Sequence, residues 1–188
     1  GETGQDESDW LKKSMFQYLF SERLKALEGS DGIIRCVTLD KQFRMHPLLG
    51  DFISRNFYER FDPVEKCDSG RPVSACAHNL QAMDGKPAAW SDVKAEMGKH
   101  LRSGTSWTRP AEASAIARQL LAWMNSDAGE NLTFAVISFY KAQADLIKKQ
   151  LGRHANDEKR LRVGTVDSFQ GMEFDVVFLS MVRTLPQN

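Results

Sequence analysis

The chain has 188 residues, and its 25 Lys and Arg side chains balance its 25 Asp and Glu side chains. Hydrophobic residues make up 41% of it and charged residues 27%, values that exclude a disordered chain and fit a globular protein. There is no run of about 18 apolar residues, so the sequence predicts no membrane span and no membrane partner. Zero net charge also removes the simplest sign of a nucleic-acid partner, which is a basic domain.

The zero net charge arises because acidic and basic segments of the chain cancel. Residues 1–9 contain four acidic side chains and no basic one, and we expect them to form an acidic flexible tail. Residues 141–162 contain seven Lys or Arg, which fits either a solvated face or a basic patch. The three cysteines form no C-x-x-C pair, and the N-terminal residues do not resemble a signal peptide. We therefore expect an intracellular protein, cytoplasmic or, in a eukaryote, nuclear.

The first half of the chain predicts two helices and one strand. Apolar spacing predicts a helix over 10–27 that ends in the turn residues of 29–32, and β-branched residues predict a strand over 33–39. A second helix runs over 47–58, with a proline in its first turn. Glycines and prolines interrupt residues 62–104, for which we expect an irregular insertion with short strands.

The second half alternates helices and strands. An amphipathic pattern predicts a helix over 110–124 and another over 142–151. Strands are predicted at 132–139, 161–166 and 174–182, and the last is so continuously apolar that it is typical of a central strand with both faces covered. This alternation predicts an α/β fold with a parallel sheet. In such sheets ligands bind beyond the carboxyl ends of the strands.

Three polar clusters follow predicted strands, at residues 40–47, 138–143 and 165–174. Each combines an amide or hydroxyl with an aromatic or basic residue. In the first, the Arg44 guanidinium can bind a phosphate through two hydrogen bonds, and the Phe43 ring offers a stacking face. Ser and Thr hydroxyls in the other two can donate to phosphate oxygens. The clusters therefore suit phosphates and flat bases.

These clusters also carry a family resemblance. LDKQFRMHP at 39–47 resembles the L-x-x-Q-Y-R-M-H-P motif of superfamily 1 helicases, in the group of the nonsense-mediated-decay helicase and related DNA helicases. TVDSFQGMEFDVVFLSMVRT at 165–184 resembles their motif V and its extension. ISFYKAQ at 137–143 resembles their T-P-Y-x-x-Q segment, and GTSWTRPAEA at 104–113 resembles the stretch before a helix in the same family. The resemblance implies that 10–188 is the C-terminal, second RecA-like motor domain, with a P-loop NTPase-type parallel sheet and helices on both faces.

The resemblance assigns five residues to ATP. Arg44 would be the arginine finger, the catalytic group that stabilises charge on the transferring phosphoryl group. Gln42 and Phe43 would lie over the nucleotide, with Phe43 stacking on adenine where the family more often has Tyr. Gly171 and Glu173 would approach the nucleotide, Glu173 as an acceptor for a ribose hydroxyl.

The resemblance also assigns residues to single-stranded nucleic acid. Thr165 and Ser168 would face the strand, and Ser138, Tyr140 and Gln143 would lie along its backbone. Such contacts read the backbone and stack on bases, so we expect no base specificity, and we favour DNA over RNA. No metal ligands are predicted.

Two features of the first motor domain are missing. The sequence contains no G-x-x-x-x-G-K-[ST] string and no apolar strand that ends in Asp-Glu. We therefore expect a fragment of an ATP-dependent helicase, truncated before the last helicase motif and inactive alone. ATP and Mg²⁺ would be cofactors of the parent protein, held with its first RecA-like domain, and the fragment alone would retain none. The alternative is a non-catalytic nucleic-acid-binding or regulatory module that keeps the motor fold.

Overall fold

The computed structural model describes residues 14–15, 18–35, 37, 39–60 and 66–183. The chain divides into two compact units, a smaller one of residues 1–43 and 50–70 and a larger one of residues 44–49 and 71–188. The expected acidic tail lies outside the described residues. No helix in the described ranges is long and apolar enough to span a membrane.

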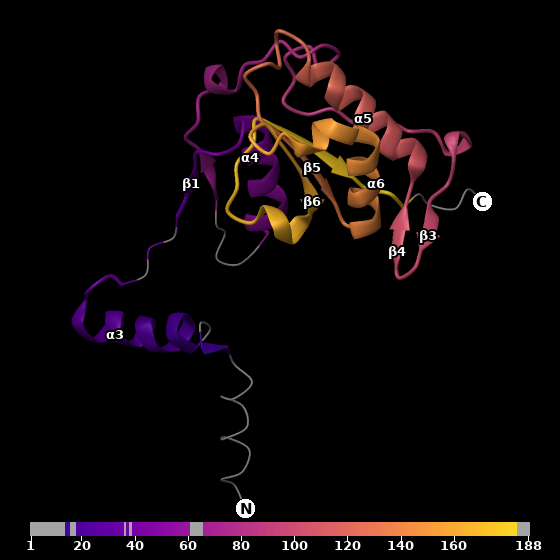
Figure 1. Cartoon of the computed structure of the whole chain (residues 1–188). Helices are drawn as coiled ribbons and strands as arrows, with labels where there is room; N and C mark the ends of the chain where they lie inside the picture. The colour runs from indigo at the N-terminus through magenta and orange to yellow at the C-terminus, as the bar shows by residue number, and fades with distance from the viewer. Residues whose placement is uncertain (1–13, 16–17, 36, 38, 61–65, 184–188) are drawn as a thin grey trace, which may run out of the picture. The chain divides into compact units, whose positions relative to one another are not determined.

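The described part of the smaller unit includes a helix (Figure 1). A π-helical turn, Tyr18–Arg23, leads into α3, Leu24–Asp31. Helix α3 ends at Gly32, which has φ +70° and donates its backbone N–H to the carbonyl of Glu28. The predicted helix is confirmed over its described part, but it extends past residue 27. Gly32, the last of the predicted turn residues 29–32, ends it, because Gly32 adopts the left-handed conformation that closes a helix.

The strand predicted over 33–39 is wrong for the described residues of that range, which are irregular. The side chains of Ile34 and Leu39 are 76% and 87% exposed. Arg35 instead bonds back to α3, since its guanidinium donates to Asp31 and its backbone N–H donates to the Glu28 carboxylate. β-branched residues favour a strand only where a neighbouring strand supplies partners, and here local bonds replace them.

A short parallel pair follows, in which β1 (Lys41–Gln42) pairs with β2 (Asp68–Ser69). Between the two strands run α4 (Pro47–Ile53) and a π-helical turn, Ser54–Tyr58, which together confirm the helix predicted over 47–58. Pro47 occupies the first helical position, where no amide donor is needed.

The larger unit is built on a parallel sheet with the strand order β6, β5, β7. These strands are Leu161–Thr165, Phe134–Ser138 and Val176–Ser180, in that order across the sheet, and they confirm the three strands predicted in the second half. The central position predicted for the last strand is wrong among the described strands, where β5 is central and β7 lies at an edge. A continuous apolar run shows that both faces of a strand are hydrophobic, but not how many neighbours it pairs with.

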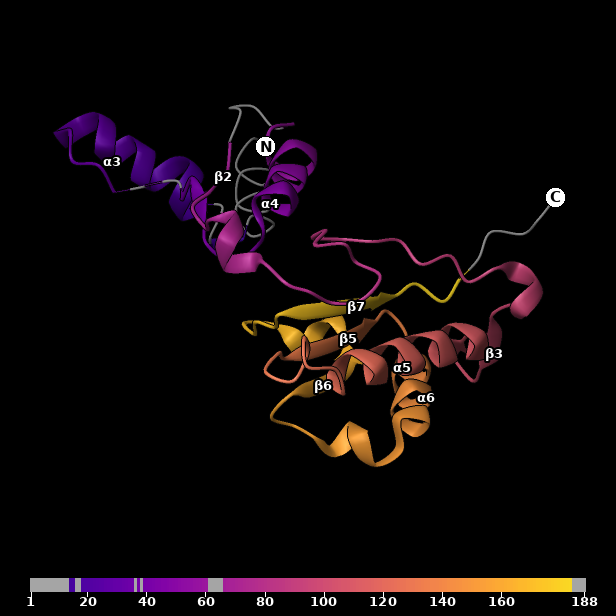
Figure 2. The same cartoon turned by 90° about the horizontal axis from the view of Figure 1, so that it is seen from above.

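Two helices cover one face of this sheet (Figure 2). Helices α5 (Pro110–Met124) and α6 (Lys141–Leu151) lie on the same side of it and confirm the predicted helices. Their buried residues pack with alternate side chains of the strands, and the side chains that meet in this core include Ala113, Leu120, Phe134, Val136, Ile147, Leu161 and Val163. Burial of each large apolar side chain contributes about 1.5–3 kcal/mol, so this core holds the three strand ends in register.

The opposite face carries a short 3₁₀ helix, Val166–Phe169, directly after β6. A Cβ atom at Gly164 would lie 2.3 Å from the Ser168 hydroxyl, so the glycine lets this helix pack against the sheet. The sheet order and the helices confirm the predicted α/β fold class with a RecA-like parallel sheet. Val177 and Leu179 of β7 remain 48% and 64% exposed.

Residues 71–109 are mostly irregular. Two 3₁₀ turns, Val73–Cys76 and Ala95–Met97, precede a hairpin of β3 (Leu101–Ser103) and β4 (Ser106–Thr108). The hairpin turns at Gly104, which has φ +60°.

A further 3₁₀ turn, Gly152–Asn156, follows α6 directly.

Candidate nucleotide and nucleic-acid sites

Three strands of the larger sheet end side by side. Ser138 at the end of β5 is in register with Thr165 of β6 and Ser180 of β7. This row of hydroxyl residues lies at the carboxyl edge, where α/β sheets bind ligands. The chain therefore brings the second and third polar clusters together, as their positions after predicted strands required.

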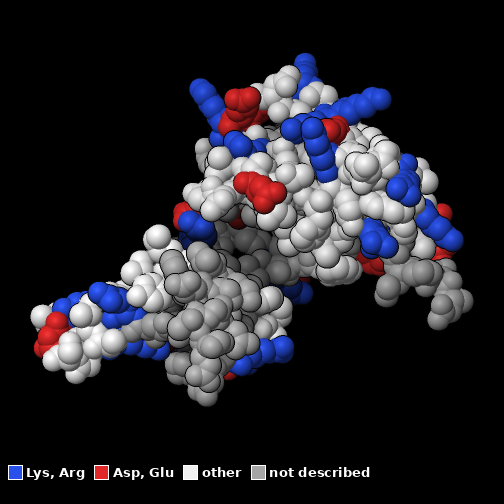
Figure 3. All heavy atoms as spheres, turned by 90° about the horizontal axis from the view of Figure 1, so that it is seen from below, with Lys and Arg blue, Asp and Glu red and all other residues white. Residues whose placement is uncertain are grey.

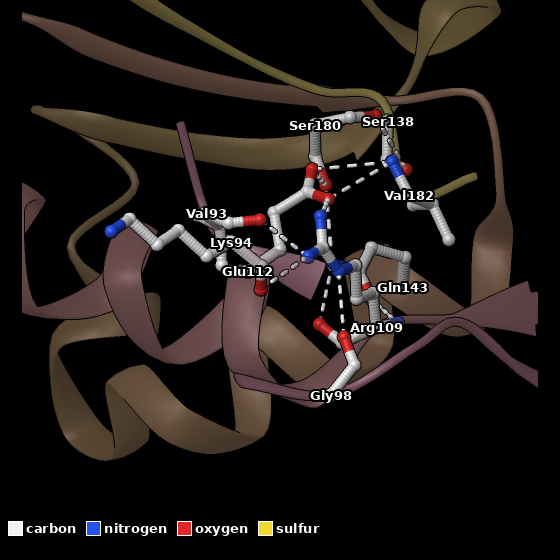
Figure 4. Close-up of polar contacts among 9 residues, drawn as sticks. All are labelled: Val93, Lys94, Gly98, Arg109, Glu112, Ser138, Gln143, Ser180 and Val182. Carbon is white, nitrogen blue, oxygen red and sulfur yellow. Dashed lines mark hydrogen bonds and ion pairs between the residues drawn. The ribbon is translucent and has the colours of Figure 1, made fainter. Parts of the chain in front are cut away.

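Gln143 lies at the centre of a buried network behind this edge (Figure 4). It is fully buried in the first turn of α6, and its Oε1 accepts the backbone N–H of Arg109 at 2.8 Å. Its Nε2 donates to the Arg109 carbonyl at 3.3 Å and to the Ser180 hydroxyl at 3.1 Å. Gln143 therefore joins the start of α6 to the start of α5 and to the end of β7.

Glu112 continues the network to the turn after β7. Its Oε1 accepts the Ser180 hydroxyl at 2.8 Å, and its Oε2 accepts the backbone N–H of Val182 at 3.1 Å. Val182 is buried and has φ +66°, a conformation that a β-branched residue adopts only under constraint. The Glu112 carboxylate supplies that constraint, since it holds the amide of the strained residue.

Arg109 ties the irregular segment to the same network. Its guanidinium donates to the carbonyls of Val93, Lys94 and Gly98, with Nε 3.1 Å from the Gly98 oxygen. The side chains of Arg109 and Glu112 are only 6% and 12% exposed, and their charges lie 3.8 Å apart. No buried side-chain nitrogen or oxygen in the described part of the chain lacks a hydrogen-bond partner. This satisfied network is what a rigid scaffold requires.

The predicted nucleic-acid residues divide by exposure. Ser138 and Gln143 are 1% and 0% exposed, so in this conformation they hold the edge of the sheet from within. The Ser138 hydroxyl accepts the backbone N–H of Tyr140 at 3.2 Å and so shapes the loop before α6. Tyr140, Thr165 and Ser168 are half-buried and lie at the surface. The Ser168 hydroxyl donates to the Thr165 carbonyl at 2.6 Å, which closes the turn between them.

Arg44 and Glu173 meet at the surface of the larger unit. Arg44 Nε lies 2.8 Å from Glu173 Oε1, and the two side chains are 58% and 64% exposed. The two residues come from the first and third polar clusters, 129 positions apart in the chain. The exposed turn before Glu173 includes Gly171, at φ +78°, a conformation that glycine adopts without strain. The structure thus brings together Arg44 and Glu173, two of the predicted nucleotide residues.

Gln42 and Phe43 belong to the smaller unit. Gln42 is half-buried, and its amide donates to the Ser69 hydroxyl at 2.5 Å. Phe43 is 66% exposed. Just before β2, the Lys66 ammonium lies 2.8 Å from the carboxylate of Asp68, the first residue of that strand, and this contact lowers the pKa of Asp68 and raises that of Lys66.

The surface does not present one sign of charge. Figure 3 shows Lys, Arg, Asp and Glu side chains interspersed over the face in view. Several of the basic residues of 141–162 are exposed, among them Lys148 and Lys149 on α6, whereas Arg160 is half-buried and donates to the Gly129 carbonyl at 2.6 Å. Part of the basic segment therefore serves the fold.

Sequence reasoning missed the residues that complete the buried network: Arg109, Ser180 and Val182. The segment GTSWTRPAEA gave one signal, because it places Arg109 and Glu112 on either side of the helix start. Arg183 follows the strained residue, and its guanidinium lies 5.6 Å from the centre of the Trp107 ring in the same segment. Only the fold shows that these residues enclose the end of β7.

The parallel sheet with its helices and the polar residues at its carboxyl edge define an α/β domain of the RecA-like class. Comparison with known proteins narrows this class. The AAA domain family matches residues 11–188. The chain is 32% identical over 170 residues to RNA helicase Mov10l1 of Mus musculus, a match that covers 89% of the chain and 14% of that protein.

Two further relatives agree. The chain is 30% identical over 177 residues to the ATP-dependent helicase upf1 of Schizosaccharomyces pombe, covering 91% of the chain and 18% of that protein. It is 28% identical over 160 residues to a regulator of nonsense transcripts 1 homolog of Arabidopsis thaliana, covering 80% of the chain and 12% of the relative. The chain belongs to the AAA domain family, among the superfamily 1 helicases of the nonsense-mediated-decay group. It spans less than a fifth of the length of these three relatives.

Proposed function

We propose that this chain is the second motor domain of a longer ATP-dependent helicase that moves along single-stranded nucleic acid inside the cell. The observation that carries the proposal is the exposed pair of Arg44 and Glu173, joined at 2.8 Å although the residues belong to two different helicase motifs. An exposed ion pair contributes little to folding, so exchanging this contact for contacts with a ligand costs little.

The nucleotide roles follow from these charges and from the neighbouring motif residues. Arg44 would stabilise the charge that develops on the transferring phosphoryl group, and Glu173 would accept a ribose hydroxyl. Phe43 would stack on adenine, with Gln42 beside it, and Gly171 would let the backbone approach the nucleotide. ATP supplies the phosphoryl group, and the residues that hold Mg²⁺ would come from a first RecA-like domain of the same protein.

The nucleic-acid contacts would lie at the carboxyl edge of the sheet. Tyr140, Thr165 and Ser168 are partly exposed there and would touch the strand, whereas the buried Ser138 and Gln143 would act by holding the loop. The preference for DNA has no support in the comparisons, since Mov10l1 is named as an RNA helicase. We therefore propose RNA as the substrate, with DNA as the alternative that the test distinguishes.

Motor action requires two domains. ATP would close the cleft between them and hydrolysis would open it, so each domain would change its grip on the strand in turn. We therefore propose that the chain alone neither hydrolyses ATP nor retains a nucleotide.

The proposal is tested by measuring ATP hydrolysis in the full-length protein with and without matched single-stranded RNA and DNA. We expect stimulation by RNA of tenfold or more and weaker stimulation by DNA, with affinity that falls as salt rises because phosphate contacts release counterions. Tyr140→Ala should weaken nucleic-acid binding by about five- to tenfold through lost stacking, and Tyr58→Ala is the matched control. A full-length protein that hydrolyses no ATP, or ATPase activity that neither strand changes, would contradict the motor.

A further inference from the structure

The segment after β2 runs beside the Gln42-Phe43-Arg44 motif. Ser69 is in register with Gln42, and the backbone N–H of Gly70 donates to the Gln42 carbonyl at 2.8 Å. The next residue of the segment, Gly70, lies against the Phe43 ring in the smaller unit, and Arg71 bonds to Arg44 in the larger unit. No role is predicted for this segment from the sequence, because it lies in the irregular stretch 62–104.

Gly70 makes room for the Phe43 ring. A Cβ atom at position 70 would lie 2.2 Å from Cε1 of Phe43 and 2.5 Å from Cζ, distances at which the ring has to move. The φ angle of Gly70 is not in the left-handed region, so the backbone there suits alanine and the glycine is needed for space alone. The Phe43 ring therefore rests on the Gly70 backbone, while 66% of its side chain stays exposed.

Arg71 holds the backbone of the arginine finger. Its Nη1 donates to the Arg44 carbonyl at 2.7 Å, and its Nη2 donates to the Ala75 carbonyl at 3.2 Å. One guanidinium thus joins residue 44 to the 3₁₀ turn at 73–76. The Arg44 side chain remains directed at Glu173, so the bond from Arg71 fixes the base of the side chain without occupying its guanidinium.

We infer that Gly70 and Arg71 are positioning residues for the nucleotide, Gly70 for the adenine-stacking ring of Phe43 and Arg71 for the phosphate-facing Arg44. The inference rests on the proposed function. Each contact lies within one unit, Gly70 with Phe43 in the smaller and Arg71 with Arg44 in the larger. Gly70 would affect the affinity for ATP, because it lets the Phe43 ring stack on adenine, and Arg71 would affect the transition state, because it holds the backbone of Arg44. A change at Gly70 should therefore alter KM, and a change at Arg71 should alter kcat.

The test is steady-state ATP hydrolysis by the full-length protein with saturating single-stranded RNA. Gly70→Ala should raise KM for ATP about five- to tenfold with kcat nearly unchanged, because the displaced ring no longer stacks on the base. Arg71→Ala should lower kcat roughly 10- to 100-fold with KM nearly unchanged, as expected for a finger displaced by about 1 Å. Matched controls are Gly29→Ala, at a glycine with open space around it, and Arg102→Ala, whose guanidinium bonds the Gly104 carbonyl. Both controls should behave as wild type.

Double variants separate positioning from general damage. Gly70→Ala should add nothing to the KM of Phe43→Ala, and Arg71→Ala should add nothing to the kcat of Arg44→Ala, whereas independent structural damage would add in full. Additive effects, or wild-type kinetics for both single variants while Phe43→Ala and Arg44→Ala are impaired, would overturn the inference and leave the proposed function standing. Wild-type kinetics for Phe43→Ala and Arg44→Ala would overturn both. Urea unfolding of each variant checks folding, and if Gly70→Ala does not fold, the Arg71 cycle decides.

Discussion

Two arginine–glutamate pairs in the larger unit have the same chemistry and opposite surroundings. Arg44 and Glu173 lie 2.8 Å apart with more than half of each side chain exposed. Arg109 and Glu112 lie 3.8 Å apart with side chains 6% and 12% exposed; backbone groups bond to both side chains, and the Ser180 hydroxyl donates to Glu112. The first pair can exchange its partner for a ligand at small cost, whereas the second cannot open without leaving charges buried.

The difference in burial separates an ion pair that is proposed to bind a ligand from an ion pair that stabilises the fold. Both pairs lie in segments that resemble helicase motifs, so a motif match alone does not tell a ligand contact from a scaffold. Burial makes the distinction, because a group that is already fully hydrogen-bonded inside the protein has nothing left to offer a ligand. The buried pair and Gln143 hold the edge of the sheet at which the proposed nucleic-acid contacts lie.

The largest stability effect is expected at the buried pair. Glu112→Ala should lower the free energy of unfolding of the 188-residue chain by about 3–5 kcal/mol, because it leaves the buried Arg109 charge without its counter-ion and the Val182 amide without its acceptor. Glu112→Gln keeps an acceptor oxygen and should cost about 1–2 kcal/mol. Urea denaturation measures both, with the exposed Glu130→Ala as control. A loss under 1 kcal/mol for Glu112→Ala would contradict the scaffold role.

Gln143 offers a second test of whether a buried motif residue stabilises the fold or contacts a ligand. Gln143→Ala should lower the free energy of unfolding by about 2 kcal/mol, since it removes three hydrogen bonds from a fully buried site. Gln150→Ala, on the exposed face of the same helix, should change it by less than about 0.5 kcal/mol. If Gln143→Ala left stability unchanged but weakened nucleic-acid binding, Gln143 would be a ligand contact and the comparison would fail.

The exposed pair should contribute little to stability. Glu173→Gln is expected to change the free energy of unfolding by less than about 1 kcal/mol, the range of exposed ion pairs. Denaturation at low and high salt measures this, and salt should remove what effect there is. A loss comparable to that of Glu112→Ala would show that the Arg44–Glu173 pair is structural.

The smallest effect concerns β2, beside the Phe43 motif. The Lys66 ammonium holds the pKa of the Asp68 carboxyl below its ordinary value of 3.8. The stability that this contact adds is therefore present above that ordinary value and is lost as pH falls through the lowered pKa. A titration of Asp68 followed by NMR should show the shift, and Lys66→Met should move the pKa back up. A carboxyl that titrates at or above 3.8 in the unaltered chain would contradict the contact.

The sequence predicted those helices and strands whose own residues carry the whole pattern of apolar spacing and flanking turns. The strands at 134–138 and 161–165 and helices α5 and α6 were found because apolar spacing and flanking turn residues agree there. The strand over 33–39 was predicted from composition alone, and the bonds of Arg35 to α3 replaced it. The edge position of β7 depends on pairing, which no local pattern contains.

The sequence predicted which residues belong to the candidate site, but not which of them are buried and which are exposed. The motif strings named Arg44 and Glu173, and the fold brought them together. The burial of Ser138 and Gln143, and the contacts of Gly70 and Arg71, depend on residues far apart in the chain. Only the folded structure shows which polar side chains form their hydrogen bonds within the protein.

The most direct test of the account is kcat for ATP hydrolysis by Arg44→Ala in the full-length protein, measured together with the urea unfolding of the same variant. We predict a loss of about 10³-fold or more in kcat with unchanged unfolding, because the proposed function assigns the exposed guanidinium to the phosphoryl group and not to the fold. Wild-type hydrolysis by Arg44→Ala, or a loss of activity that follows a loss of stability, would contradict the account.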